Sequence, residues 1–162
     1  MRIQFTRFRR HDGFSLVELM AVLAILAILT AVAVPNFTSV IEANRARNAS
    51  IELFSALTLA RSEAIKRNTK VKIARADDAE WEDGWTITIV DNGTEIAGHG
   101  ALPKVVIDTS SDAPDVTFTR TGRIDGTAPD FQVDVSATAT GHVRCISLDT
   151  MGRPASVKEA CS

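Results

Sequence analysis

Glu18 is the residue whose chemistry is hardest to explain as packing, because it is the only charge in a long apolar stretch. Residues 14–34 contain no other ionisable side chain. An isolated carboxylate in a membrane span costs about 2.5–3.5 kcal/mol or more, so such a residue usually marks a functional site. Phe14 lies four residues before Glu18, a spacing that places both side chains on one face of a helix. The sequence therefore predicts that Glu18 serves a contact that an ordinary anchor does not need.

The apolar stretch itself has the length of a membrane span. It holds 21 residues, and a helix of that length covers the roughly 30 Å hydrocarbon core of a bilayer. A secretory signal has an apolar region of about 7–15 residues, which is shorter. The preceding segment contains Arg2, Arg7, Arg9 and Arg10 but only one acid, Asp12, and basic flanks remain in the cytoplasm. We expect a single-pass protein whose larger part lies outside the cytoplasm.

Two cysteines, Cys145 and Cys161, are the other candidates for covalent chemistry. In an extracytoplasmic compartment disulfides persist, so we expect these two residues to pair within the chain. Closing this loop would contribute roughly 3 kcal/mol on the entropic account. Free buried thiols and pairing between chains are the alternatives. Zinc is not favoured, because His99 and His142 stand alone and no C-x-x-C occurs.

The sequence does not indicate an enzyme. It lacks the nucleophile elbow, the H-E-x-x-H zinc motif and the P-loop. The acidic run within residues 77–83 could attract calcium, but it lacks the spacing and the glycine of an EF-hand, and a solvated loop explains it better. We therefore expect no catalytic residue, no metal and no cofactor.

Beyond Pro35, where a kink is expected, the helical spacing of apolar residues continues to about Asn68. One side of this helix carries Ile51, Phe54, Thr58 and Ile65, and the adjoining side carries Leu53, Leu57, Ala60 and Ala64. Together they form a wide apolar arc of the kind that packs on a sheet. Glu52, Glu63 and Lys66 fall on the opposite side. Arg61 falls within the arc, so its side chain must either reach out to solvent or be paired within the domain that follows the helix.

After Asn68 the apolar pattern changes to alternation, which is typical of strands. Asp91-Asn92-Gly93 is a hairpin turn, and Trp81 and Trp85 are expected to anchor the core or a loop. One long helix followed by short antiparallel strands predicts an α+β fold. The expected strands are residues 71–75, 85–90, 104–107, 116–119, 131–135, 142–148 and 154–157.

The charges are divided unevenly along the chain. Residues 45–75 hold eight basic and two acidic side chains, whereas residues 76–162 hold six basic and fifteen acidic ones. A solvated helix face explains the basic segment most simply. The functional alternatives are contact with anionic lipid, with an acidic neighbour or with nucleic acid.

The segment from Gly13-Phe14-Ser15-Leu16-Val17 to Glu18 resembles the class III signal of type IV prepilins. A plain single-pass anchor is the alternative. The resemblance implies that a prepilin peptidase cuts after Gly13 and that Phe14, the new N-terminus, is methylated. Methylation keeps the positive charge of the α-amino group, whose reference pKa is about 7.7–8.0. Glu18 would then pair with an N-terminus in its own chain or in a neighbouring subunit, which helps to set the stagger in the filament.

Further motifs narrow the resemblance to the FimT/FimU and GspH group of minor pilins and pseudopilins. They are the run from Ala60 to Asn68, Gly84-Trp85, the run from Phe118 to Arg123, and the run from Ile146 to Pro154. The resemblance implies a leader at 1–13, a transmembrane half-helix at 14–36, an amphipathic half-helix at 37–68 and a periplasmic antiparallel β head at 69–162.

This group resemblance implies a subunit of a filament and not an enzyme. The first interpretation is a FimT/FimU-type minor pilin that helps to prime pilus assembly and supports motility or adhesion. The alternative is a GspH-type minor pseudopilin of type II secretion. The implied partners are minor and major pilins, the prepilin peptidase, the assembly platform and lipid of the bacterial inner membrane. The N-terminus would be cytoplasmic and the head periplasmic until the protein enters the filament.

A third interpretation is a DNA receptor for natural transformation. FimT-type proteins of that kind carry a C-terminal Gly-Arg-x-Arg motif, and here Gly152-Arg153-Pro154 is followed by Ala155 in place of the second arginine. Only Arg153 matches, with Arg144 and Lys158 near it in the sequence. DNA affinity depends on several phosphate contacts, so these three residues predict at most weak binding.

Replacing Gly13 with arginine should block processing, because a bulky charged residue would occupy the position next to the expected cleavage site. Mass spectrometry of the protein from the source bacterium should then find the uncut chain. Recovery of a variant that begins with methylated Phe14 would contradict the assignment of the signal.

Overall fold

The structure is a computed structural model that describes residues 14–76, 80–111, 113–135 and 142–162, with only the backbone described for residues 32–36. It contains one long helix, α1 (Leu16–Arg67), followed by short strands. The chain divides into two compact units, Met1–Ser39 and Val40–Ser162. In the first unit, the described residues form the N-terminal half of α1. The second unit, here called the head, contains the rest of α1 and all the described strands.

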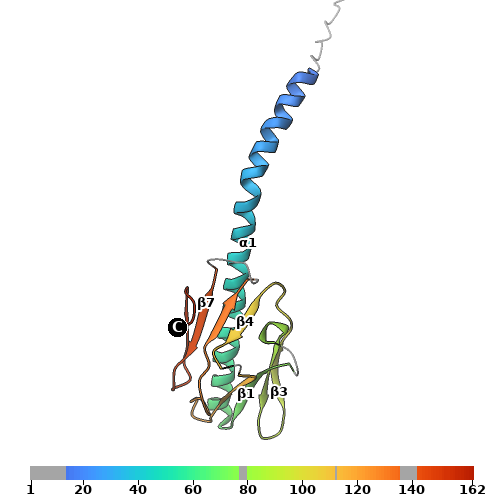
Figure 1. Ribbon diagram of the computed structural model, residues 1–162. Helices are drawn as coiled ribbons and strands as arrows, with labels where there is room; N and C mark the ends of the chain where they lie inside the picture. The colour runs from blue at the N-terminus through green and yellow to red at the C-terminus, as the bar shows by residue number, and fades with distance from the viewer. Residues whose placement is uncertain (1–13, 77–79, 112, 136–141) are drawn as a thin grey trace, which may run out of the picture. The chain divides into compact units, whose positions relative to one another are not determined.

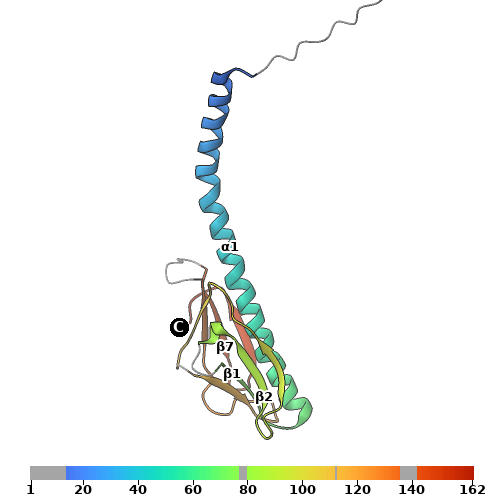
Figure 2. The ribbon, with the colours of Figure 1, turned by 90° about the vertical axis from the view of Figure 1, so that its right-hand side faces the viewer.

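Two antiparallel sheets of four strands form the β part of the head. The first has the order β3-β2-β1-β5, and the second has the order β4-β6-β7-β8. Figures 1 and 2 show the C-terminal half of α1 lying along these strands. The α+β fold predicted from the sequence, a long helix packed on an antiparallel β head, is confirmed. The bounds are β1 Val71–Arg75, β2 Trp85–Ile89, β3 Glu95–His99, β4 Val106–Thr109, β5 Asp115–Phe118, β6 Phe131–Asp134, β7 Arg144–Leu148 and β8 Pro154–Val157, with a short 3₁₀ helix, η1, at Trp81–Asp83.

One strand was not expected, and several strand boundaries differ from the expected ones by one or two residues. β3 was not predicted, because Gly98 interrupts its interior and its side chains are mostly exposed or half-buried. It pairs with β2 across a register shift between Ile87 and Thr88, and such irregular edges lack a clean alternation. β4 begins at Val106, since Lys104 has a φ of 61°, which is not a strand conformation.

The core is built from one narrow stripe of α1 and the inner faces of both sheets. Leu53, Leu57, Ala60 and Ala64 are completely buried, and they pack with side chains such as Ile73 and Phe131 from the strands. Ile51 and Ile65 are about half exposed, at 51% and 47%, so the buried arc is narrower than the sequence predicted. Small alanines on the stripe allow the strands to approach the helix axis, which leaves the flanking isoleucines outside the contact.

Both tryptophans anchor the head, as expected. Trp81 is 1% exposed and Trp85 is 2% exposed. The indole N–H of Trp81 donates to the carbonyl of Ala113 at 2.9 Å, and its ring meets Phe131 edge-on at 5.0 Å. The buried polar end of the indole is therefore satisfied, as large buried aromatics require.

The disulfide between Cys145 and Cys161 is present, with 5.0 Å between the two Cα atoms. It ties the C-terminal end of the chain to β7. Cys145 is 5% exposed and Cys161 is half-buried, so the β7 side of the bond is the shielded one.

Two polar residues of α1 find partners that the helical pattern could not specify. The Nε of Arg61 donates to the carbonyl of Gly122 at 3.0 Å, so this residue is paired within the head. Glu63 was expected on the solvent side, but it is only 8% exposed. Its carboxylate forms ion pairs with Arg67 and with Lys66, the latter at 3.2 Å. Hydrogen bonds from Arg67 and then from Lys66 lower the pKa of Glu63 below its ordinary value.

The Glu63 cluster should make stability depend on pH. A carboxyl group with a lowered folded-state pKa stabilises the native state above its unfolded pKa, and that contribution is lost as the pH falls through the folded pKa. In urea titrations of the full-length protein in an uncharged detergent, Glu63→Gln should be less stable than the wild type at neutral pH. The difference should shrink between about pH 5 and pH 3. A difference that stays constant over this range would contradict the assignment.

Candidate assembly site

The N-terminal end of α1 contains the residues that the sequence singled out, and the helix starts two residues later than Phe14. Ser15 caps it: the backbone N–H of Glu18 donates to the Ser15 hydroxyl oxygen at 3.2 Å, and the N–H of Leu19 donates to the Ser15 carbonyl at 3.1 Å. Serine at this position satisfies a donor that the helix leaves open. Phe14 therefore precedes the helix, which corrects the expectation that it shares a helical face with Glu18. Gly13 lies outside the described residues.

Glu18 sits in the first turn of α1, at the third helical position. A carboxylate there is favoured by the partial positive charge of the helix N-terminus. Ser15 and Glu18 have the S-x-x-E spacing of a capping box, a signal in the sequence that would have located the helix start. The structure adds a local reason for an acid at this position, beyond any contact with a neighbour.

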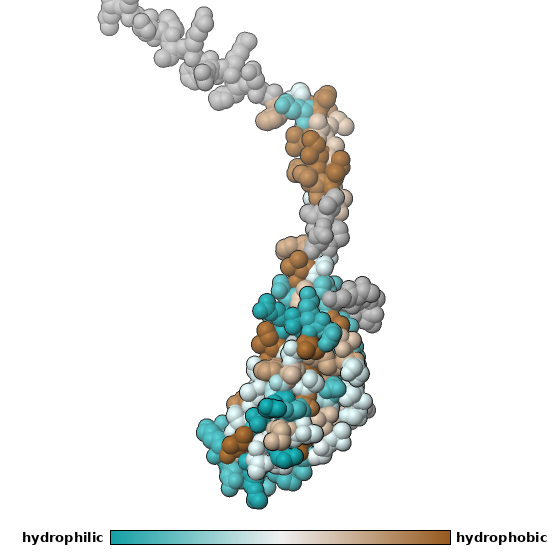
Figure 3. All heavy atoms as spheres, turned by 90° about the vertical axis from the view of Figure 1, so that its left-hand side faces the viewer, coloured by the Kyte–Doolittle hydropathy of each residue, from teal (hydrophilic) through white to brown (hydrophobic). Residues whose placement is uncertain are grey.

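Apolar side chains surround the helix that follows. Leu16 and Val17 are 74% and 75% exposed, and the large apolar residues that continue to Leu29 are between 44% and 67% exposed. Figure 3 shows them as an almost continuous brown surface. A helix that is apolar on every side is normally covered by lipid or by other helices. Within the part of the chain that the structure describes, no helix is both long enough and apolar enough to cross a membrane.

In the turn between β7 and β8, Arg153 is hydrogen-bonded to Asp149. The backbone N–H and the Nε of Arg153 both donate to the Asp149 carboxylate, at 2.8 and 2.7 Å. The backbone bond and then the guanidinium bond lower the pKa of Asp149. Arg153 is thus already engaged with an acid of its own chain.

The three candidate DNA contacts do not lie together. β7 and β8 pair in the register Cys145↔Val157 to Leu148↔Pro154. Arg144 and Lys158 therefore lie at one end of this pair and Arg153 at the other, about 17 Å away at the usual rise of a strand. The structure does not assemble the basic cluster that several simultaneous phosphate contacts would need.

Glu82, in the described part of the acidic run, has a structural role. The Glu82 carboxylate accepts the backbone N–H of Ile107 at 3.0 Å, which fixes η1 to β4. Asp77 and Asp78 lie outside the described residues. Among the residues that the structure does describe, no group of three or more histidine, cysteine, aspartate or glutamate side chains is placed to hold a metal ion.

Gly152 makes the turn before β8, and it also packs closely against the loop that contains Gly122. Its φ is 75°, and a Cβ atom at this position would collide with the carbonyl oxygen of Gly122. The Gly122 carbonyl is the same group that accepts the Arg61 side chain. The Gly-Arg-Pro turn is therefore a packing element of the head.

The comparisons with known proteins agree with this architecture. The prokaryotic N-terminal methylation motif matches residues 8–34, and the family described as Type II transport protein GspH matches residues 49–152. No curated protein matches the chain by sequence.

Solved structures share the fold. The type IV minor pilin FimU of Pseudomonas aeruginosa is 24% identical, with a TM-score of 0.63 over 69% of this chain and 87% of FimU. A second crystal form of FimU gives a TM-score of 0.61 over 68% and 91%. The minor pseudopilin EpsH of the type 2 secretion system of Vibrio cholerae is 13% identical, with a TM-score of 0.57 over 70% of this chain and 97% of EpsH.

The long helix, the antiparallel head and the methylation motif together define a type IV minor pilin or pseudopilin. The GspH match covers more than half of the chain, so the protein belongs to the Type II transport protein GspH family. Family and fold are those of structural filament subunits, which are assembled with other pilins.

Gly152→Ala should destabilise the head more than Gly93→Ala. Both glycines have positive φ, but a Cβ atom at Gly93 would meet nothing within 4 Å. In Gly93→Ala the free energy of unfolding should fall only by the cost of a left-handed alanine, about 1–2 kcal/mol. In Gly152→Ala the collision of the new Cβ atom with the Gly122 carbonyl oxygen should lower it further. Thermal unfolding followed by near-UV circular dichroism would measure both. Equal losses in the two variants would rule out the packing role of Gly152.

Proposed function

We propose that this protein is a minor pilin of a type IV pilus, of the FimT/FimU type, which takes part in starting pilus assembly. Its apolar N-terminal segment would reside in the bacterial inner membrane, with the head in the periplasm, until the assembly platform lifts the helix into the filament. The apolar surface around residues 16–29, which has no covering partner among the described residues of its own chain, supports a filament subunit. In a helical bundle those side chains would be buried. The choice of a pilus rests on the greater likeness to FimU than to EpsH, at 24% against 13% identity.

Processing would precede assembly. In this proposal the prepilin peptidase cuts after Gly13, and Phe14 becomes the methylated N-terminus, in keeping with the methylation motif over residues 8–34. Ser15 would then cap a helix that begins one residue further on. The new terminus would lie close to the first turn, where an adjacent Glu18 carboxylate could reach it.

Glu18 would act as the assembly contact. Its carboxylate is favoured by the N-terminal end of its own helix, but that partial charge leaves most of its charge uncompensated in an apolar bundle. The cationic N-terminus of a neighbouring subunit would complete the neutralisation. The pairing would set the axial offset between two helices, because both groups sit at defined positions in the first turn.

The second candidate is a minor pseudopilin of a type II secretion system. The description of the matching family favours it, and EpsH is a protein of that kind with the same fold. Both candidates use the same helix and the same kind of head, so they differ in the filament that receives the subunit. DNA uptake is not favoured, given that Arg153 lies at the opposite end of the β7–β8 pair from Arg144 and Lys158.

Deletion of the gene in the source bacterium should remove most surface pili and twitching motility, and leave secretion of exoproteins unchanged. A plasmid with the wild-type gene should restore the pili. The Glu18→Ala gene should yield a processed, membrane-bound protein that does not restore them, because the subunit lacks its pairing carboxylate. Sheared pili and culture supernatants, both quantified by immunoblot, provide the measurements.

The control for this experiment is Glu42→Ala, which removes an acid from α1 outside the first turn. It should restore the pili like the wild type. Loss of secretion with intact pili would favour the pseudopilin. Normal amounts of the Glu18→Ala protein in sheared pili would refute the assembly contact.

A further inference from the structure

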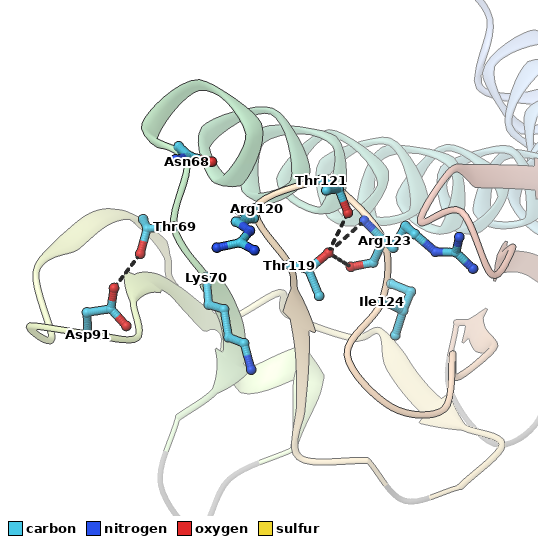
Figure 4. Close-up of a pocket in the computed structure, with 9 residues that line it drawn as sticks. All are labelled: Asn68, Thr69, Lys70, Asp91, Thr119, Arg120, Thr121, Arg123 and Ile124. Carbon is cyan, nitrogen blue, oxygen red and sulfur yellow. Dashed lines mark hydrogen bonds between the residues drawn. The ribbon is translucent and has the colours of Figure 1, made fainter.

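An open hollow of about 650 Å³ lies at the C-terminal end of α1, and the proposed function assigns no role to it. Three segments line it: the turn that joins α1 to β1, the tip of the β2–β3 hairpin, and the loop that follows β5 (Figure 4). Its lining residues are Asn68, Thr69, Lys70, Asp91, Ile124 and the run 119–123 without Gly122.

Backbone hydrogen bonds hold the walls of this hollow in place. Asn68, with a φ of 52°, ends the helix, and its N–H donates to the Ile65 carbonyl at 3.2 Å. In the β5 loop, the N–H of Gly122 donates to Thr119 at 2.7 Å. Gly122 also lies close to Ile65: an added Cβ atom would come within 2.6 Å of the Ile65 Cδ1 atom, so that side chain would have to shift. The loop is therefore held against α1, and a site on it would need little rearrangement to bind a ligand.

Most polar groups around the hollow already have partners. The Thr69 hydroxyl donates to the Asp91 carboxylate at 2.6 Å, and Lys70 pairs with Asp125 at 2.6 Å. The hydroxyl groups of Thr119 and Thr121 lie 3.0 Å apart and bond to each other. Asp91 is therefore engaged by a hydroxyl group, whereas Asp125 already neutralises the Lys70 ammonium.

The guanidinium groups of Arg120 and Arg123 lack such partners among the described residues, and that of Arg120 faces the hollow. The exposed side chain of Arg120 makes no hydrogen bond or ion pair with any residue that the structure describes. Figure 4 shows its guanidinium between the Asn68–Lys70 turn and Thr119, with Lys70 on the same side of the loop and the Arg123 guanidinium directed away. An arginine fork carries five donors that match the oxygens of an oxyanion. The N–H groups of the Arg120 guanidinium therefore face the hollow from the loop after β5, which backbone hydrogen bonds hold in place.

The charge of the site is opposite to that of the chain. The lining contains Lys70, Arg120 and Arg123 against the single acid Asp91, whereas the whole chain has a net charge of −2. Long-range attraction of anions by the protein is therefore weak, and any anion bound here must be held by local contacts.

We propose that this hollow binds a ligand that carries a phosphate group, with Arg120 as the main contact. The guanidinium would donate hydrogen bonds to two phosphate oxygens, and the Lys70 ammonium would donate a further one through an N–H group that Asp125 does not use. Phosphate is favoured over a carboxylate because it offers more than one negative charge and more oxygens, both to the Arg120 guanidinium and to the Lys70 ammonium that already pairs with Asp125. The volume leaves room for the organic part of a phosphate ester. This site lies on the head and does not depend on which filament receives the subunit.

Titration of the ¹⁵N-labelled full-length protein with inorganic phosphate, in an uncharged detergent and at constant ionic strength, tests this proposal. The amide signals of residues 68–70 and 119–124 should shift and saturate, while those of β7 and β8 should not. Glycerol phosphate and a thymidine dinucleotide, as competing ligands, would distinguish a phosphate monoester from a phosphodiester as the natural source. The absence of saturable shifts with all three ligands would overturn the proposal.

Arg120→Gln should weaken phosphate binding at least about tenfold, which corresponds to about 1.4 kcal/mol. Arg47→Gln is the matched control, since it removes the same charge from an exposed site on α1 and should leave the affinity unchanged. An equal loss of phosphate affinity in the two variants would mean that the affinity depends only on the net charge of the protein. Unchanged affinity of Arg120→Gln would remove Arg120 from the site, and either result would refute the proposal.

Discussion

The head depends on the packing of one stripe of α1 against two sheets. Leu53, Leu57, Ala60 and Ala64 recur at spacings of three and four residues and are completely buried. Full burial of one leucine side chain stabilises a fold by roughly 1.5–3 kcal/mol, and the two alanines let the strands come close enough for this burial to occur. Because both sheets reach the same stripe, neither sheet has a core without the helix.

The same helix contains a second apolar surface, which is exposed and not buried. Between Leu16 and Leu29 the large apolar side chains are exposed on all sides, where the C-terminal half buries a single stripe. A filament subunit needs both properties: a head that is stable alone, and a helical segment that becomes stable only when lipid or neighbouring helices cover it. Ser15 and Glu18 define where this segment begins, because the cap supplies the hydrogen bond that the first turn lacks.

Loops complete the head through a few polar and close backbone contacts. The Gly122 carbonyl accepts Arg61 and also packs against Gly152, so the end of β5, α1 and the turn before β8 meet at one point. The β5 loop is thereby held beside the end of α1, where Arg120 is left with free donors. The packing contact and the proposed anion site are consequences of the same loop geometry.

The sequence alone determined the features that follow from local periodicity and composition. These are the long helix, the alternating strands, the hairpin turn at Asp91–Gly93, the disulfide pairing as the simplest of its alternatives, and the resemblance to minor pilins and pseudopilins. Gly13 and the processing of Phe14 remain predictions, as does the pairing of Glu18 with a neighbour. The S-x-x-E spacing of Ser15 and Glu18 also marked the start of the helix, although the expected half-helix at 14–36 began at Phe14.

Tertiary structure decided what periodicity cannot encode. It placed Glu63 inside the head and Ile51 and Ile65 outside the contact, because burial depends on which strands reach the helix and not on the helical angle alone. It separated Arg153 from Arg144 and Lys158, since residues near in sequence lie at opposite ends of an extended strand. It also brought Arg120 beside Lys70, fifty positions apart in the chain, because a loop and a helix end that carry no shared motif meet only in the folded head.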